Sequence, residues 1–254
     1  MARLNHDFSP LNQRVGFTFN TLHVLLKYWL DCWDGSHPLL DIGCGNCLNS
    51  LQAAETGARV IATELNPKVI PELKEQHRGT GIEFDCLHLP ETIPFKDETF
   101  SGILCAEVFH FLDHEEVLAS IQRFYDLLIP GGKVILTTVS EDLSLLQPVG
   151  LKQLRVAQRE RDGSCMKALR EYQDLFCAAR NLEPEGHPAW EIYAAHLDAY
   201  QPGYFNFFYP EQLATAFKRQ GFDIELIELG AANHYPIWKH GPQDQVRLVA
   251  GKPE

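Results

Sequence analysis

The sequence lacks an apolar run of the roughly 18 residues that a membrane-spanning helix requires. Its first residues, MARLNHDFSP, also lack the apolar segment of a secretory signal peptide. We therefore expect a cytoplasmic protein with no membrane partner. Its 254 residues, of which 45% are hydrophobic, suffice for a large core and predict one domain, or one domain with a sizeable insert.

Basic residues are scarce: 22 Lys and Arg stand against 34 Asp and Glu, so the formal net charge is -12. Such a chain repels phosphate backbones unless its basic residues gather on one face. The densest basic stretch, residues 152–170, is interrupted by Glu160 and Asp162, which is typical of a solvated helix face. We therefore expect no nucleic-acid partner; the sequence leaves the oligomeric state open.

Cysteine is present, but its pattern predicts neither a disulfide framework nor a metal site. The seven cysteines are odd in number and irregularly spaced. Cys44 and Cys47 form a Cys-x-x-Cys, but a structural zinc site needs two more suitably spaced ligands, which the sequence lacks. We expect no metal. A redox pair stays an alternative, because a helix start lowers the pKa of a thiol.

Short apolar runs alternate with helical patterns along the chain. Helices are expected at 17–33, 48–56, from 67 onward, at 113–128 and at 210–221; strands are expected at 39–42, 59–63, 82–84, 102–106, 133–139, 223–229 and 246–250. Such alternation predicts an α/β fold whose mostly parallel sheet is covered on both faces. The last two strands have no helix between them, so we expect an antiparallel hairpin at an edge.

Residues 141–204 break this alternation and predict a helical insert. The sequence that ends it, WEIYAAHLDAYQPGYFNFFYP, is rich in aromatic side chains. We expect this insert to form a lid. The predicted organisation is an N-terminal helical cap at 1–37, a core at 38–140 and 205–254, and the lid at 141–204.

The stretch LLDIGCGNC places two glycines directly after the first core strand. Gly43 and Gly45 allow a sharp turn and let a ligand lie against the backbone. Glu64 ends the next strand, 19 residues after Gly45, where a carboxylate can accept hydrogen bonds from both hydroxyls of a ribose. Together these features predict a nucleoside cofactor more specifically than a lone Gly-x-Gly does.

Two residues argue against a dinucleotide in that site. Asn49 stands where the third glycine of Gly-x-Gly-x-x-Gly would be. Asp41, next to the loop, would repel a diphosphate and suits a cation with an amino group. This combination favours S-adenosylmethionine, whose sulfonium and ammonium groups are positive.

At these residues the sequence resembles the class I S-adenosylmethionine-dependent methyltransferases of the small-molecule type. The matching pieces are LLDIGCGNC, VIATELNP, LPETIPFKDETFSGILCAEVFHFL, LLIPGGKVILTT and YPEQLATAFKRQGFDIELIEL. The resemblance implies a doubly wound, Rossmann-like sheet of seven strands in the order 3-2-1-4-5-7-6. It also implies S-adenosylmethionine as cofactor and S-adenosylhomocysteine as product.

The resemblance further implies a set of cofactor-binding residues. Those beside the methionine portion are Asp41, Gly43, Cys44 and Gly45; those beside ribose and adenine are Glu64, Leu65, Asp85 and Cys86; those at the end of the fourth strand are Ala106 and Glu107. The segment 85–94 is longer than is usual in the family, so the adenine contact can shift by one or two residues.

Oxygen and nitrogen acceptors often need a base near the transferred methyl group. His110, just after the fourth strand, is the best-placed candidate; the insert contributes His196, Tyr200 and Tyr204. An aromatic lid suits a small organic acceptor. We therefore expect a small-molecule methyltransferase. The alternatives are methylation of RNA or protein, and a catalytically inactive regulatory module that retains the cofactor site.

Overall fold

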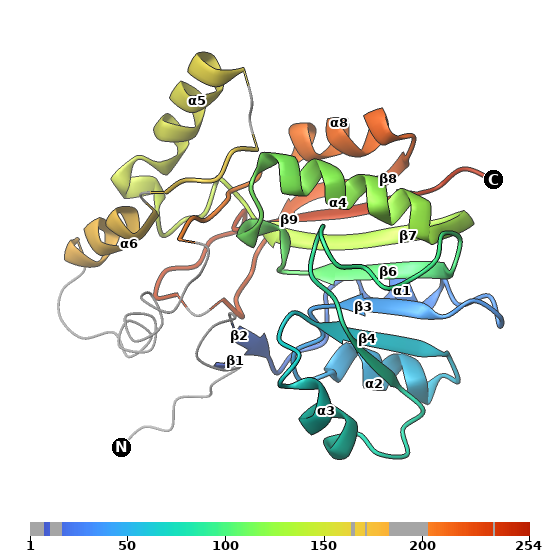
Figure 1. The fold of residues 1–254 in the computed structure, drawn as a ribbon. Helices are drawn as coiled ribbons and strands as arrows, with labels where there is room; N and C mark the ends of the chain where they lie inside the picture. Colours follow the sequence, from blue (N-terminus) through green and yellow to red (C-terminus); the bar gives the residue numbers. More distant parts are fainter. Residues whose placement is uncertain (1–7, 11–16, 164–165, 171, 183–202, 236) are drawn as a thin grey trace, which may run out of the picture.

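The computed structural model describes residues 8–10, 17–163, 166–170, 172–182, 203–235 and 237–254. Its main feature is a seven-stranded sheet in the order β5-β4-β3-β6-β7-β9-β8 (Figure 1). The strands are β3 (Leu39–Ile42), β4 (Val60–Glu64), β5 (Glu83–Cys86), β6 (Phe100–Ala106), β7 (Leu128–Val139), β8 (Asp223–Gly230) and β9 (Gln245–Gly251). Counted from β3, this order is 3-2-1-4-5-7-6, which confirms the predicted topology.

Strands β3 to β7 pair in parallel, and β9 is antiparallel to both β7 and β8. The expected antiparallel hairpin is therefore present, with β8 at the edge. Because β3 lies between β4 and β6, the chain leaves β3 in one direction along the sheet and resumes at β6 in the other. Ligands of such sheets bind at this switch point, outside the carboxyl ends of the strands.

Helices cover both faces of the sheet, as the near-continuous apolar strands require. On one face, α4 (His114–Leu127) and α8 (Pro210–Gln220) pack over Leu40 and Ile103. On the other, α1 (Leu26–Leu30) and α2 (Leu48–Glu55) pack over Leu39 and Leu104. Neighbouring residues of one strand thus serve opposite layers, as the period of two dictates. The short α3 (Ile70–Gln76) packs beside β5.

Asp113 caps the start of α4. The Asp113 side chain accepts a hydrogen bond from the backbone N–H of His114 at 2.8 Å, and Glu116 accepts one from the backbone N–H of Asp113 at 2.7 Å. This capping box satisfies backbone donors that the first turn leaves free. It fixes where the chain enters α4 and so holds the preceding 3-10 turn, η1 (Phe109–Phe111), at the end of the sheet.

The prediction of a single helix over 17–33 is wrong for its first half. Phe17–Phe19 is a strand, β2, paired antiparallel with β1 (Phe8–Pro10), and the helix is confined to α1. Thr18 Oγ1 accepts a hydrogen bond from the Asn46 backbone N–H at 2.9 Å, and the His23 N–H donates to Asn49 Oδ1 at 2.8 Å. These tertiary bonds outweigh the weak helix propensity of a segment with Thr and Asn.

In its described residues, the insert after β7 contains the helices α5 (Leu151–Asp162) and α6 (Tyr172–Asn181), which lie beyond the end of the sheet (Figure 1). Arg155, 1% exposed, ties α5 to the core by donating to the Phe207 carbonyl at 2.7 Å. The fully buried Glu141 carboxylate forms an ion pair with Arg159. Across the described residues, no helix combines the length and apolar character needed to cross a membrane.

Candidate active site

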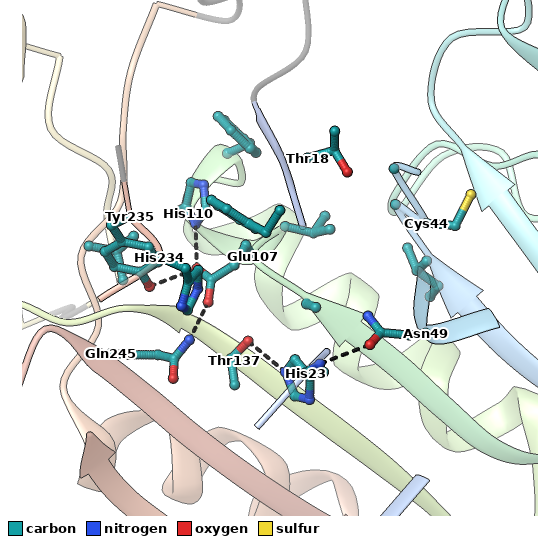
Figure 2. Close-up of a pocket in the computed structure, with 18 of the residues that line it drawn as sticks. Thr18, His23, Cys44, Asn49, Glu107, His110, Thr137, His234, Tyr235 and Gln245 are labelled. Atoms are coloured by element: carbon teal, nitrogen blue, oxygen red, sulfur yellow. Dashed lines mark hydrogen bonds and ion pairs between the residues drawn. The ribbon is translucent and has the colours of Figure 1, made fainter. Parts of the chain in front are cut away.

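A cavity of about 880 Å³ opens at the carboxyl ends of the strands, beside the switch point between β3 and β6. Its walls come from the loop after β3, the ends of β4, β6, β7 and β9, the segment 18–24 and the loop between β8 and β9. This volume lies within the range of cofactor and ligand pockets. Figure 2 shows the polar side chains that converge on it.

The loop after β3 adopts the turn that its glycines predict. Gly43 and Gly45 have φ of 72° and 56°, in the left-handed region that favours glycine. A Cβ at Gly43 would lie 2.9 Å from Val108 Cγ2, so a side chain has no room there. The N–H groups of Gly43 and Cys44 donate to the Thr63 carbonyl at 2.9 and 3.0 Å, which anchors the loop to β4. Gly43, Cys44 and Gly45 all line the cavity.

Glu64, 4% exposed, presents its carboxylate to the cavity from the end of β4. Its Oε1 accepts the Gly45 N–H at 2.8 Å and its Oε2 accepts the Leu65 N–H at 3.2 Å. Burial raises the pKa of Glu64, whereas these two hydrogen bonds act against that rise. Each carboxylate oxygen has a second lone pair, so the group retains the capacity to accept both ribose hydroxyls. The donor set therefore fits an adenosyl cofactor.

Asp41 lies beneath the loop rather than in the cavity wall, which differs from the expected direct contact with the methionine portion. It is 2% exposed and accepts the Ser50 hydroxyl at 2.6 Å. Burial raises its pKa to about 7; the Ser50 hydrogen bond lowers it and the nearby Glu64 charge raises it further. Its direct contact is with α2, so it acts on the loop through that helix.

This buried carboxyl predicts a pH-dependent stability. The pKa of Asp41 rises from 3.8 to about 7 on folding, so between these values the unfolded chain has released a proton that the folded chain retains. The contribution of Asp41 to the free energy of unfolding therefore falls as pH rises through this window, by on the order of 3 kcal/mol between pH 5 and pH 8. Buried histidines with lowered pKa values contribute in the opposite direction, so the effect of Asp41 is measured as the difference between wild type and a variant.

We expect Asp41→Asn to reduce this fall, because asparagine accepts the Ser50 hydroxyl without a titrating charge. The measurement is urea denaturation of both proteins at pH 5 and pH 8. Asp31→Asn, at an exposed position, is the control and should leave the fall unchanged. An equal fall in wild type and Asp41→Asn would contradict the assignment.

The two cysteines of this loop form a buried contact. The Sγ atoms of Cys44 and Cys47 are 3.5 Å apart, with Cys47 as donor. That hydrogen bond, and to a lesser extent burial, raises the pKa of Cys44 well above its usual value. A reactive thiol requires a lowered pKa instead. Within the described residues, no group of three His, Cys, Asp or Glu side chains is arranged to hold a metal ion.

The cavity wall near β5 is displaced along the chain from the predicted adenine contact. Leu65 lines the cavity as expected and is 41% exposed. Asp85, however, is exposed on β5, and the Cys86 thiol donates to the Leu65 carbonyl at 3.4 Å. Leu87 and His88 occupy the wall instead. The shift is two residues, because β5 continues to Cys86 before the chain turns across the site.

Ala106 and Glu107 line the cavity at the end of β6. Glu107 has a φ of 58°, and this turn directs its side chain toward β9 and the loop before it. Its Oε2 accepts the Tyr235 hydroxyl at 2.8 Å and its Oε1 accepts Gln245 Nε2 at 2.7 Å (Figure 2). Burial raises the pKa of Glu107, and these donors act against that rise.

His110 also lines the cavity, on the 3-10 turn η1. Its ring stacks on Phe205 with centroids 4.7 Å apart and an interplanar angle of 26°. Burial lowers its pKa to about 3, so the ring is neutral at physiological pH. Its Nδ1 lies 3.8 Å from Glu107 Oε2.

The remaining catalytic candidates have different positions. Tyr204 lines the cavity and donates its hydroxyl to Glu116 Oε2 at 2.6 Å. Burial and that carboxylate raise its pKa well above the usual value, so Tyr204 serves as a hydrogen-bond donor. His196 and Tyr200 lie outside the described residues.

Several residues of the site carried no recognisable sequence signal. His23 accepts the Leu25 N–H on Nδ1 at 3.2 Å, so its Nε2 carries the hydrogen that faces Thr137 Oγ1 at 3.0 Å. Burial lowers its pKa to about 3. His23 lines the cavity, and its backbone N–H donates to Oδ1 of Asn49, the residue at which the third glycine is missing. Gln245 and Arg247 of β9 also line the cavity.

The comparisons with known proteins agree with this geometry. The family model described as "Methyltransferase domain" matches residues 40–136. The chain is 28% identical to a protein from Aliivibrio fischeri that is named "Ubiquinone biosynthesis O-methyltransferase". The match spans 158 residues, which are 59% of this chain and 63% of that protein. One of the same name from Cereibacter sphaeroides is 33% identical over 105 residues, 41% of this chain and 42% of that protein. The matches thus cover less than two thirds of these relatives.

Solved structures show the same fold. A SAM-dependent methyltransferase from Methanosarcina mazei has a TM-score of 0.61 at 16% identity, over 91% of this chain and 98% of that chain. The 1,6-didemethyltoxoflavin-N1-methyltransferase of Burkholderia thailandensis, solved with S-adenosylhomocysteine, has a TM-score of 0.53 at 15% identity, over 91% and 79%. These structures show that the chain has the fold of the S-adenosylmethionine-dependent methyltransferases, and residues 40–136 match the methyltransferase domain model.

Proposed function

We propose that this protein transfers a methyl group from S-adenosylmethionine to an oxygen atom of a small organic acceptor. The observation that supports it most directly is the Glu64 carboxylate, held by the Gly45 amide where the cavity passes the glycine loop. The relatives named as O-methyltransferases favour oxygen as the acceptor atom. When bound, the cofactor supplies a methyl group already activated by a positive sulfur.

The chain's own residues have three tasks in this proposal. Glu64 accepts the ribose hydroxyls, and the bare backbone at Gly43 and Gly45 lets the cofactor approach closely. The Glu64 carboxylate lines the cavity, so its negative charge suits a cationic cofactor. Alignment of acceptor and methyl group with exclusion of water supplies most of the catalysis that such a displacement needs.

The other half of the cavity suits an apolar acceptor. Its walls include Phe111, Leu143, Phe176, Phe205 and Ile237. Apolar and aromatic walls with few polar groups are typical of small-molecule sites. The net charge of -12 disfavours RNA as the acceptor. We therefore place the acceptor between these walls and His110, which is our candidate for the proton acceptor.

The test is an assay of S-adenosylhomocysteine release with a panel of phenols, alcohols, amines, thiols and carboxylates. We expect turnover with at least one hydroxyl compound and none without acceptor. Calorimetry with S-adenosylmethionine gives the independent measurement of cofactor binding. No binding at millimolar cofactor would refute the proposal. Binding without transfer to any member of the panel would instead favour a cofactor-binding regulatory module.

A further inference from the structure

Glu107 and His110 face each other at the end of β6. Their side chains are each 8% exposed, and Glu107 Oε2 lies 3.8 Å from His110 Nδ1. Within the described part of the chain, this buried Nδ1 has no hydrogen-bond partner. Figure 2 shows Nδ1 directed at the Glu107 carboxylate, with the second ring nitrogen on the opposite side of the ring. A buried nitrogen without a partner requires an explanation.

The Glu107 carboxylate is fixed in this orientation. Gln245 Oε1 accepts Arg247 Nε at 3.0 Å, so the Gln245 amide must direct its NH₂ group at Glu107 Oε1. The Tyr235 hydroxyl donates to Oε2, and burial together with Glu107 raises the pKa of Tyr235 far enough that it remains a donor. The Thr137 side chain is a third donor to this carboxylate, and Oε2 is the oxygen 3.8 Å from His110 Nδ1.

We propose that Glu107 is a positioning residue that keeps a proton on His110 Nδ1, so that Nε2 presents its lone pair to a hydroxyl group of the acceptor. The inference rests on the proposed function and narrows the acceptor to alcohols and phenols. A carboxylate beside Nδ1 attracts an N–H at that nitrogen. It repels the lone pair that Nδ1 would have if the proton were on Nε2 instead. The separation of 3.8 Å closes to a hydrogen bond with a small rotation of the ring, as is common for catalytic pairs without ligand.

In the reaction, the acceptor oxygen forms a bond to the methyl carbon while the carbon–sulfur bond breaks and its electron pair returns to sulfur. The O–H bond breaks, and its proton passes to His110 Nε2. The ring thereby becomes an imidazolium, and its positive charge is balanced by Glu107. Burial keeps the His110 ring neutral before the reaction, so that Nε2 can accept the proton. The Glu107 carboxylate then stabilises the positive charge of the imidazolium, as the carboxylate of a catalytic triad does.

Replacement of Glu107 by glutamine gives a sharp test, because the surrounding donors fix how the amide must lie. The glutamine oxygen has to take the Oε1 position, opposite the Gln245 NH₂ group. Its own NH₂ group then takes the Oε2 position, where the Tyr235 hydroxyl can rotate to accept one hydrogen and His110 Nδ1 must accept the other. The proton on His110 is therefore expected to move from Nδ1 to Nε2, and the ring would donate to an acceptor hydroxyl instead of accepting from it.

The experiment is two-bond ¹H–¹⁵N spectroscopy of protein labelled with ¹⁵N-histidine, with the His110 signals assigned by their loss in His110→Gln. In wild type we expect neutral His110 protonated on Nδ1; in Glu107→Gln we expect protonation on Nε2. Glu55→Gln, an exposed position on α2, should leave the spectrum of His110 unchanged. Protonation of Nε2 in wild type, or the same tautomer in both proteins, would overturn the inference.

Wild type alone decides the outcome if Glu107→Gln fails to fold. Calorimetry with S-adenosylmethionine separates this inference from the proposed function: wild type that fails to bind cofactor refutes the function, whatever the tautomer. Glu107→Gln should bind the cofactor within a factor of about three of wild type. With an acceptor from the panel, it should lose at least tenfold in kcat. Loss of cofactor affinity with an unchanged His110 tautomer would instead make Glu107 a cofactor ligand.

Discussion

Glu64→Ala is expected to weaken the binding of S-adenosylmethionine by roughly 30-fold or more, which corresponds to about 2 kcal/mol. Two causes add. The ribose hydroxyls lose charge-assisted hydrogen bonds to a carboxylate, which are stronger than neutral ones. The N–H groups of Gly45 and Leu65, which now donate to Glu64 at 2.8 and 3.2 Å, also lose their acceptor.

Isothermal titration calorimetry of wild type and variant measures this loss directly. Glu64→Gln separates the two causes, because its amide oxygen can still accept the Gly45 N–H; it should bind more tightly than Glu64→Ala and more weakly than wild type. Glu55→Ala, on the exposed end of α2, is the matched control and should bind as wild type does. Equal affinity of Glu64→Ala and wild type would show that the cofactor site lies elsewhere.

Arg155→Ala is expected to lower the free energy of unfolding by about 3 to 5 kcal/mol, because it leaves buried acceptors without their donor and opens a cavity in place of a large buried side chain. Arg155 Nε lies 4.0 Å from Glu141 Oε2, and Nη1 donates to Gln158 Oε1 at 2.6 Å. The variant leaves the Phe207 carbonyl without its donor, while Glu141 keeps Arg159 as its ion-pair partner. The loss of packing by the long arginine stem adds to the effect.

Urea denaturation followed by circular dichroism checks this value. Arg161→Ala, on the same helix, is the control: its side chain is 73% exposed and pairs with Asp162 at the surface. Such a change should stay within about 0.5 kcal/mol of wild type. If Arg155→Ala were no less stable than Arg161→Ala, the connection between α5 and the 206–207 segment would contribute nothing to folding.

The core of the fold was predictable because its signals are local. Each signal lies within a few residues of the structure that it predicts. Examples are the glycines after β3, the acid that ends β4 and the turn before α4. The predicted strands matched because apolar runs of this length have few alternatives in a sheet covered on both faces. The full strand order came from the resemblance, since no local pattern states which strands are neighbours.

The parts that could not be predicted depend on contacts between distant residues. The start of the 17–33 segment became a strand because Asn46 and Asn49 supply hydrogen bonds that no local pattern reports. The direction of Glu107 depends on donors 128 and 138 residues away. The cavity wall beside β5 begins at Leu87, two residues beyond the predicted Asp85, because the length of β5 is set by its pairing with β4. Periodicity contains no information of this kind.

The position of β9 has a consequence for biosynthesis. This strand is the latest of the seven in the chain, yet it lies between β7 and β8 and carries Gln245 and Arg247 (Figure 1). While β9 is still emerging from the ribosome, β7 and β8 have no partner between them, and Glu107 lacks the Gln245 donor. The glycine loop and Glu64 lie earlier in the chain, so a nascent chain can form the proposed cofactor loop before the full set of donors that orient Glu107.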